Sequence, residues 1–367
     1  MATCNASAGA GRVFDVTLDQ MWLACSMNSV EAVAELFPNA DPAMWAEPLN
    51  LVVCQGYVEV ARFLWDNMEE YDVVAYTHGH CPLHAACSAG RPEMVKFLME
   101  RLSDFAVSGY DALATTPLNR ACAFPDTAVA LEIALLLLDR LPLERLWMQN
   151  NTYHREEMQG TPLHVACGRK NTELVRYFVE HVEAKDLFKS DMMGRVPVER
   201  LFKDLPVKGP DPSRAAILAS ILQATTASEQ RELTRSLDPS WRTVLLSNDV
   251  ACVRTMYDWL QEENFVLGAR MTTPPLHTAC LRDCGETLAF LLSVLPEKYI
   301  RATFAESTTT PLHIAAREGS ESCLRVLLST LPPECVNVPD EEGRPPELVV
   351  HPPLAHMFQP RVKSAAG

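Results

Sequence analysis

The stretch Thr161-Pro162-Leu163-His164-Val165-Ala166-Cys167 returns along the chain with small changes. Its close copies read Cys-Pro-Leu-His-Ala-Ala-Cys, Pro-Pro-Leu-His-Thr-Ala-Cys and Thr-Pro-Leu-His-Ile-Ala-Ala, and they begin at Cys81, Pro274 and Thr310. Looser copies begin at Glu47 and Thr116. Most copies follow one another at intervals of about 35 residues. A motif that returns in this way indicates a repeat architecture, in which each unit packs only on its neighbours.

Each copy has the features of a helix start. A Thr before the Pro can cap the helix, and Pro at the first helical position loses no hydrogen bond. In the copy that starts at Cys81, we expect Leu83, Ala86 and Cys87 to share one face of a short helix. Gly90 ends that helix, and the stretch 93–98 predicts a second, amphipathic helix. Two short helices cannot bury their apolar faces alone, so the copies must stack.

The motif resembles the hallmark of the ankyrin repeat, Thr-Pro-Leu-His-x-Ala on a period near 33 residues. The resemblance implies an all-α solenoid of about nine stacked helix-turn-helix repeats, joined by hairpin-like turns and closed by a partial C-terminal cap. We expect a single ankyrin-repeat domain over residues 16–358, between flexible tails at 1–15 and 359–367. The repeats align on positions Gln20, Pro48, Pro82, Pro117, Pro162, Pro197, Ser240, Pro275 and Pro311, and the cap begins at Pro346.

Two intervals are longer than the others, and each indicates an insertion. Residues 142–159 lie between the fourth and fifth repeats, and we expect a longer finger or a short extra helix there. Residues 206–212 are rich in Pro, Gly and Asp and predict a loop. The helical stretch Arg214–Gln223 then becomes the second helix of the sixth repeat. The seventh repeat, Trp241–Leu260, is identified by its position and its apolar pattern.

The charge of the chain is uneven. The net charge is −15, with 21 acidic and 9 basic side chains in residues 1–160 but 26 and 23 in residues 161–367. An acidic chain matches the phosphate backbone poorly, so we expect no nucleic-acid partner. The most apolar run, Ala128–Leu138, contains Glu132 and is too short to span a bilayer, so we expect no membrane segment.

Twelve cysteines raise the question of disulfides. Neighbouring repeats stack at roughly the 8–10 Å of packed helices, whereas a disulfide needs Cα atoms within about 7 Å. We therefore expect buried free thiols, which indicate a reducing compartment, the cytosol or the nucleus. Five of these cysteines share one position, five residues past the Pro position: Cys25, Cys87, Cys122, Cys167 and Cys280.

Several His and Cys residues have the spacing of chemical sites. A His precedes a Cys by three residues in three copies, as a helical Cys–His nucleophile pair would require. A catalytic dyad is needed only once, and in ankyrin-like proteins this His braces the turn, so we expect no enzyme. The set His78, His80, Cys81 and His84 contains metal-ligand types without a second regular pair, and Cys280 and Cys284 have no His partner. We therefore expect no metal and no cofactor.

The resemblance also implies a concave binding face, lined by turn tips and by the residues six and seven past the Pro position. In the early repeats this face includes Met27 and Phe124. From the fifth repeat onward it carries basic residues. We expect these residues to bind a protein partner through an acidic segment, while the alternative interpretation is a solvated charged face. The basic residues are Arg169, Lys203, Arg282 and Arg317, with Arg195 and Arg344 at neighbouring turn positions.

The predicted function is protein–protein recognition by a monomeric scaffold or adaptor with a preformed groove. Two alternatives stay open. One is a substrate-recognition subunit of a ubiquitin ligase, for which the last 30 residues show no docking segment that we can identify. The other is an enzyme, or the targeting arm of one, whose site the two insertions would form.

Overall fold

The structure is a computed structural model, and it describes residues 16–40, 42–68, 81–147, 160–203, 211–225, 238–267, 274–296 and 309–358. The chain divides into two compact units, Met1–Val165 and Ala166–Gly367. The described residues form helices and turns and no β-strand. The predicted all-α repeat fold is therefore confirmed, whereas the count of nine repeats and the single domain stay predictions.

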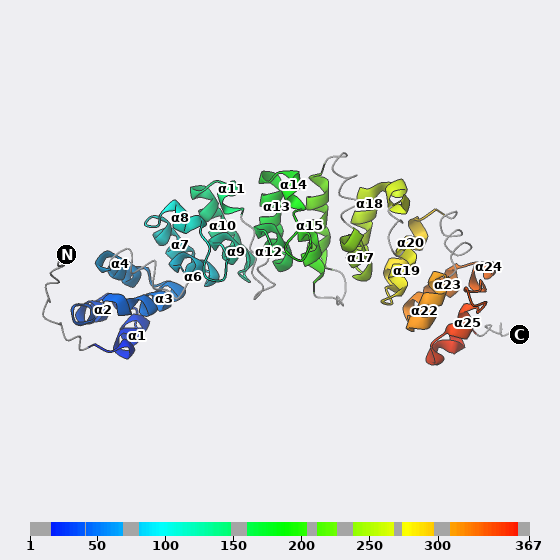
Figure 1. Ribbon diagram of the computed structural model, residues 1–367, viewed down its shortest axis with the longest axis horizontal. Helices are drawn as coiled ribbons and strands as arrows, with labels where there is room; N and C mark the ends of the chain where they lie inside the picture. Colours follow the sequence, from blue (N-terminus) through cyan, green and yellow to red (C-terminus); the bar gives the residue numbers. More distant parts are fainter. Residues whose placement is uncertain are drawn as a thin grey trace, which may run out of the picture. The chain divides into compact units, whose positions relative to one another are not determined.

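In the first unit, a first helix that begins near the Pro position alternates with a second helix. The first helices are α1 (Leu18–Ser26), α3 (Ala46–Gln55), α6 (Pro82–Ser88) and α9 (Pro117–Cys122). The second helices are α2 (Val30–Leu36), α4 (Val58–Asn67), α7 (Pro92–Met99) and α10 (Thr127–Arg140). Short helices follow in the connections: η1 (Phe37–Asn39), η2 (Pro42–Trp45), α8 (Asp104–Ser108) and α11 (Leu143–Leu146). Figure 1 shows α3, α6 and α9 on one side of this unit and α4, α7 and α10 on the other.

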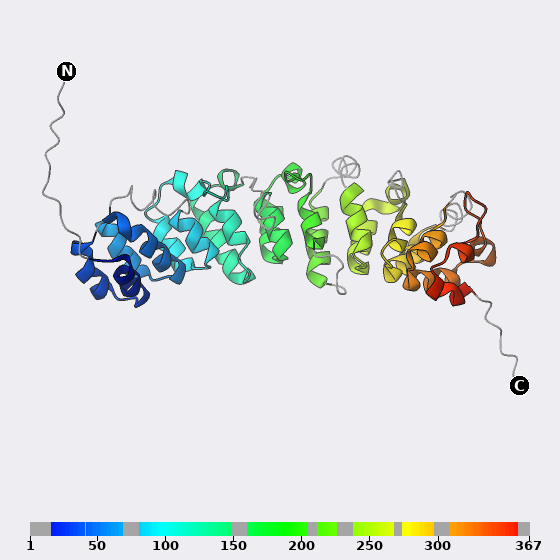
Figure 2. The same cartoon turned by 60° about the horizontal axis from the view of Figure 1, so that its bottom comes forward.

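The second unit has the same alternation, and α12 (Pro162–Arg169) carries the boundary between the units. Its further first helices are η4 (Pro197–Phe202), α17 (Asp238–Leu246), α19 (Pro275–Cys280), α22 (Pro311–Glu318) and α25 (Pro346–Val349). Its second helices are α13 (Thr172–His181), α15 (Pro212–Gln223), α18 (Val250–Leu267), α20 (Gly285–Val294), α23 (Glu321–Thr330) and, in the cap, η6 (Pro352–Phe358). The helices of this unit stand side by side (Figure 2). The short α14 (Ala184–Leu187) and α24 (Pro333–Val336) lie in its connections.

Local sequence signals explain where these helices begin and end. The hydroxyls of Thr116 and Thr310 accept hydrogen bonds from backbone N–H groups three residues later, at 3.2 and 3.4 Å. Gly56 and Gly319 end α3 and α22 with φ values of 80° and 72°, which favour Gly. The helix α10 stops directly before Leu141-Pro142, and α20 and α23 stop at the same dipeptide.

The pattern of buried residues in the core is the same from one repeat to the next. The residue after the Pro position is fully buried, as Leu83, Leu118 and Leu276 illustrate. The five equivalent cysteines are each 0% exposed. This burial confirms the alignment of the repeats, because a shift by one residue would carry these side chains to another face of the helix.

The predicted insertions lie partly outside the described residues. The first contains the short helix α11, which has counterparts in α8, α14 and α24, and the rest of it is not among the described residues. For the second, Asp211 caps α15, which serves as the second helix of the sixth repeat as predicted. The first helix of that repeat is a 3-10 helix, η4, rather than an α-helix. The two predicted tails also lie outside the described residues.

Candidate functional site

Three motif histidines, His84, His277 and His313, contact the turn of the following repeat. Nε2 of His84 lies 2.9 Å from the carbonyl oxygen of Thr115, and Nε2 of His313 lies 3.0 Å from that of Arg344. The imidazole of His277 makes the same contact with a carbonyl of the following turn, at 2.8 Å. Because a carbonyl only accepts, Nε2 carries a proton and donates it in each of these three contacts. The bracing role that the resemblance implied is confirmed.

Whether the other imidazole nitrogen, Nδ1, has a hydrogen-bond partner depends on the residue before the Pro. The hydroxyl of Thr161 lies 2.9 Å from Nδ1 of His164, and its backbone N–H donates to that atom at 3.1 Å. Cys81 stands in this place before His84, and Nδ1 of His84 is buried without a hydrogen bond. Burial disfavours the charged imidazolium and lowers the pKa of His84 to about 4. This histidine is therefore neutral at physiological pH.

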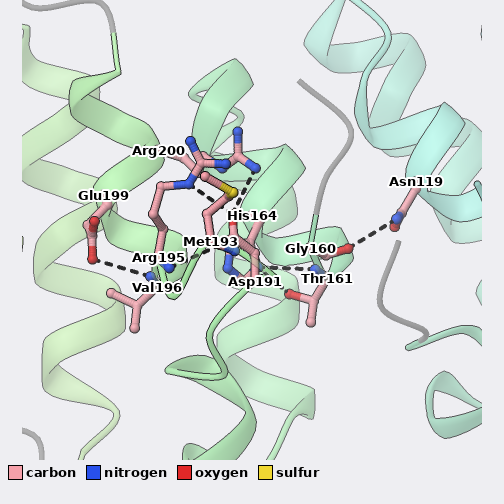
Figure 3. Close-up of polar contacts among 10 residues, drawn as sticks. All are labelled: Asn119, Gly160, Thr161, His164, Asp191, Met193, Arg195, Val196, Glu199 and Arg200. Carbon is pink, nitrogen blue, oxygen red and sulfur yellow. Dashed lines mark hydrogen bonds and ion pairs between the residues drawn. The ribbon is translucent and has the colours of Figure 1, made fainter. Parts of the chain in front are cut away.

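Two repeats without the histidine contain a buried ion pair instead. Asn119 takes the histidine position in the fourth repeat, and its Nδ2 donates to the carbonyl of Gly160 at 3.3 Å (Figure 3). The next residue, Arg120, places Nη2 2.5 Å from Oδ2 of Asp111, and both side chains are buried. Sequence analysis missed this pair, although the Arg that follows the histidine position was a visible signal.

The sixth repeat has the equivalent pair. Glu199 takes the histidine position, and Nη2 of Arg200 lies 3.1 Å from Oδ2 of Asp191 (Figure 3). The carboxylate of Asp191 also accepts the backbone N–H groups of Met193 and Arg195, at 2.9 and 3.0 Å. Burial alone would raise the pKa of Asp191, but these backbone hydrogen bonds and the two guanidinium groups hold it below its usual value.

Two of the predicted partner-binding residues contribute to these turns. Nε of Arg195 lies 3.0 Å from Oδ2 of Asp191, and Nη2 of Arg344 lies 3.0 Å from Oδ2 of Asp340. Both arginines are half-buried. A charge that is already paired offers less attraction to an external carboxylate, so Arg195 and Arg344 stabilise turns in this structure.

Phe124 also has a structural contact. A Cβ atom on Gly90 would lie 2.1 Å from the ring of Phe124, so the ring packs directly on that glycine of the preceding repeat. Gly90 has a φ of 64°, which L-residues rarely adopt. Phe124 is half-buried and therefore presents only part of its ring as a contact surface.

In three turns where the residue is not glycine, its side chain reaches the next repeat. Lys170, Asn248 and Asp283 all have positive φ. Nζ of Lys170 lies 2.7 Å from Oδ2 of Asp211. The side-chain oxygens of Asn248 and Asp283 accept backbone N–H groups near the start of the next second helix, at 3.2 and 3.0 Å. These contacts attach each turn to its neighbour and were not predicted.

The remaining four basic residues, Arg169, Lys203, Arg282 and Arg317, form what we call the basic row. Arg169 and Arg317 occupy the last turns of α12 and α22, whereas Lys203 and Arg282 follow η4 and α19. Arg169 is half-buried and the other three are exposed. Because η4 contacts α17, α17 contacts α19, and α19 contacts α22, the row follows consecutive first helices of the second unit.

The basic row is interrupted at α17, where the equivalent residues are Leu246 and Ser247. Met27, the remaining predicted contact, directly follows α1 in the first unit and is 63% exposed. The structure thus presents Met27 and three members of the basic row to solvent.

The thiols of Cys87 and Cys167, each three residues after a motif histidine, are unsuited to nucleophilic chemistry. Burial raises the pKa of Cys87 and Cys167 well above the ordinary value, and it raises the pKa of Cys25 to about 12. A neutral thiol is a poor nucleophile. The histidines direct Nε2 to turn carbonyls, as described above for His84. The recurring His–Cys spacing is therefore explained by packing and bracing.

The described residues contain neither a metal-binding cluster nor a membrane-spanning helix. There, no group of three or more His, Cys, Asp and Glu side chains is arranged to hold a metal ion. His78 and His80 lie outside the described residues. Along the same described segments, no helix combines the length and the apolar character needed to cross a membrane.

Comparison with known protein families identifies the repeat. The model described as ankyrin repeats in three copies matches residues 20–108. The model of the single ankyrin repeat matches residues 160–191 and 309–341. A search of curated proteins finds no match to the chain. The matched stretches coincide with helix pairs of the structure and contain the Thr-Pro-Leu-His copies at Thr161 and Thr310. The chain therefore belongs to the ankyrin-repeat family.

Proposed function

We propose that this chain is a scaffold or adaptor that binds a protein partner and that the basic row receives an acidic segment of that partner. Ankyrin repeats are generally protein–protein interaction modules and are typically not enzymes, which supports the first part. The position of the basic row carries the second part. Four basic side chains lie at the ends of first helices in one unit, within a chain whose net charge is −15.

The expected energies determine how the basic row must be tested. An exposed ion pair contributes about 0.2–1 kcal/mol, so one substitution would change binding little. Arg169 and Arg317 lie in the last turns of their helices, where a positive charge also stabilises the helix dipole by about 0.3–1 kcal/mol. A test must therefore change the whole row and must compare it with basic residues of similar exposure elsewhere.

The test begins with the intact chain as bait in a pull-down that identifies the partner by mass spectrometry. Two variants are then compared with the wild type at low and high salt. One changes the basic row to Glu. The matched control makes the same change in net charge at four exposed basic residues on other surfaces of the second unit, namely Arg176, Lys185, Arg254 and Arg325.

The basic-row variant should bind more weakly, and its affinity should depend less on salt. The control variant should bind as the wild type does. If the two variants bind with equal affinity and equal salt dependence, the basic row is only a solvated charged face and the acidic partner segment is refuted.

The proposal also includes a monomer in the cytosol or the nucleus. Free cysteines support that compartment, because disulfides form and persist in oxidising ones. Subcellular fractionation tests the compartment. Sedimentation equilibrium of the purified full chain tests the monomer, and a concentration-dependent mass would contradict it.

A further inference from the structure

The first helices at the N-terminal end of the chain present a surface that the basic row does not use. Burial establishes which residues of α1, α3 and α6 are equivalent. Met21, Leu49 and Leu83 are each 0% exposed, and so are Cys25, Val53 and Cys87. These pairs place equivalent residues 28 positions apart between α1 and α3 and 34 apart between α3 and α6.

The outward face of these three helices carries apolar side chains at one equivalent position. Leu23 is 63% exposed, and Leu51 and Ala85 are half-exposed. We call these three residues the apolar row. Because α1 contacts α3 and α3 contacts α6, the row crosses three neighbouring helices.

One helical turn away on either side, the surface changes character. Asp19 and Glu47 lie in the first turns of α1 and α3, are exposed, and form an acidic row beside the apolar one. On the other side lie Met27, Gln55 and Ala89, which carry no charge. The apolar row, the acidic row and these three residues together are called the N-terminal face.

The apolar character of the N-terminal face is marked at α1. Trp22, Leu23 and Met27 are 37%, 63% and 63% exposed, so three large apolar side chains meet solvent within six residues. Single exposed apolar residues are ordinary, whereas adjacent ones rimmed by polar groups mark a contact surface.

The charge around this face is negative. Residues 1–160 carry 21 acidic and 9 basic side chains. Several basic groups of the first unit are already bound within it. Arg62 pairs with Glu59, Lys96 pairs with Glu93, and Nε of Arg91 donates to the carbonyl of Cys54 at 2.9 Å. A partner is therefore attracted by basic rather than acidic side chains.

We propose that the N-terminal face binds an amphipathic helix of a protein partner, with apolar side chains on the apolar row and basic side chains against Asp19 and Glu47. Packed helices lie about 8–10 Å apart, and residues seven apart on a helix are separated by about 10.5 Å along its axis. A partner helix that crosses α1, α3 and α6 thus offers one apolar side chain to each. This inference rests on the proposed protein-binding function, but it concerns a different surface and a partner of opposite charge.

The test uses the full chain and synthetic peptides of about 20 residues, which as helices span about 30 Å. The first peptide has Leu at helical spacing on one face and Lys on the flanks. The second has Glu in place of Lys, and the third is a scrambled form of the first. Fluorescence anisotropy measures binding, and hydrogen exchange locates the protected residues.

We expect the Lys peptide to bind about tenfold more tightly than either other peptide and to protect residues 18–27, 46–55 and 82–89. The double variant Leu23→Ser, Met27→Ser should weaken that binding about tenfold, because both side chains lose apolar contact area. The double variant Asp19→Asn, Glu47→Gln should reduce its salt dependence. Circular dichroism confirms that each variant is folded, as expected for exposed positions.

The basic-row Glu variant is the control that separates the two proposals. It should bind the Lys peptide at least as tightly as the wild type does, whatever its effect on the pulled-down partner. Three results would each overturn the inference: no binding of the Lys peptide, equal binding of the Lys and Glu peptides, or unchanged binding by the Leu23→Ser, Met27→Ser variant.

Discussion

Replacing Arg120 by Met tests whether the buried ion pair with Asp111 braces the turn that precedes α9 in the fourth repeat. Nη2 of Arg120 lies 2.5 Å from Oδ2 of Asp111, and Nε donates to the hydroxyl of Thr115 at 2.7 Å. The side chains of Arg120 and Asp111 are 6% and 0% exposed. Met keeps much of the aliphatic volume of Arg, so the substitution mainly removes the charge and its hydrogen bonds.

The expected loss in the free energy of unfolding arises because the substitution leaves the buried carboxylate of Asp111 without its guanidinium partner. Breaking a buried pair by removing one partner costs about 3–5 kcal/mol. Asp111 still accepts hydrogen bonds from the backbone N–H groups of Leu113 and Thr115 and from the Thr115 hydroxyl, at 2.9, 2.9 and 2.7 Å. These bonds partly stabilise the carboxylate, so we expect a loss near the lower limit, about 3 kcal/mol.

The measurement is urea unfolding followed by circular dichroism, together with hydrogen exchange of residues 111–122. Hydrogen exchange is needed because repeat arrays can unfold in parts. The matched control is Arg325→Met. Nη2 of Arg325 lies 2.7 Å from Oε1 of Glu321, but the Arg side chain is 69% exposed, so its loss should cost less than about 1 kcal/mol. Equal losses in the two variants would refute the bracing role of Arg120.

The same pair predicts a pH effect. Burial opposes ionisation of Asp111, but the hydrogen bonds from Thr115 and Arg120 outweigh it and lower the pKa of the carboxyl. A folded-state pKa below the unfolded value of about 3.9 contributes stability above that pH, and this stability is lost as the pH falls further. In Arg120→Met the pKa of Asp111 should rise, so acid unfolding should begin at a higher pH than in the wild type.

Four further predictions concern the motif positions and the cysteines. The wild type should lose stability as the pH falls from about 6.5 to about 4, because the folded-state pKa of His84 lies below its unfolded value. The variant His84→Asn should lack this loss. Thermal unfolding at pH 7 and pH 5 tests it, and an unchanged pH dependence would contradict it. Cys81→Thr should stabilise the protein by about 0.5–2 kcal/mol through a new cap, whereas a lower melting temperature would show that Cys81 is better suited to the site. Ala279→Asp should unfold the stack at ambient temperature or shift its melting midpoint strongly, because an unpaired carboxylate would be buried where Ala279 is 0% exposed; an unchanged midpoint by circular dichroism would contradict the repeat alignment. All twelve cysteines should react with an alkylating agent under denaturing, non-reducing conditions, and an intact mass that shows cystine bridges would contradict the proposed compartment.

The sequence by itself determined the repeat unit and most of its helices. Thr, Pro and Gly act within one turn of their own position, so Thr310, Pro311 and Gly319 define the start and end of α22 without reference to the rest of the chain. The burial of Leu and Cys at equivalent positions follows from the 3.6-residue period of the helix. The sixth repeat departs from this rule, because Glu199 and the residues around it form a 3-10 helix.

Only the tertiary structure decided which of the predicted contact residues are exposed and so available to bind a partner. The sequence assigns Arg195, Arg282 and Arg317 to the same binding face, yet Arg195 pairs with a buried Asp191 while the other two are exposed. Phe124 covers Gly90, which lies 34 positions earlier and one repeat away. A helix start depends on neighbours along the chain, whereas the partner of a charged or aromatic side chain depends on which groups the folded stack brings within a few ångströms. That choice arises from contacts between turns and repeats, which local sequence signals do not specify.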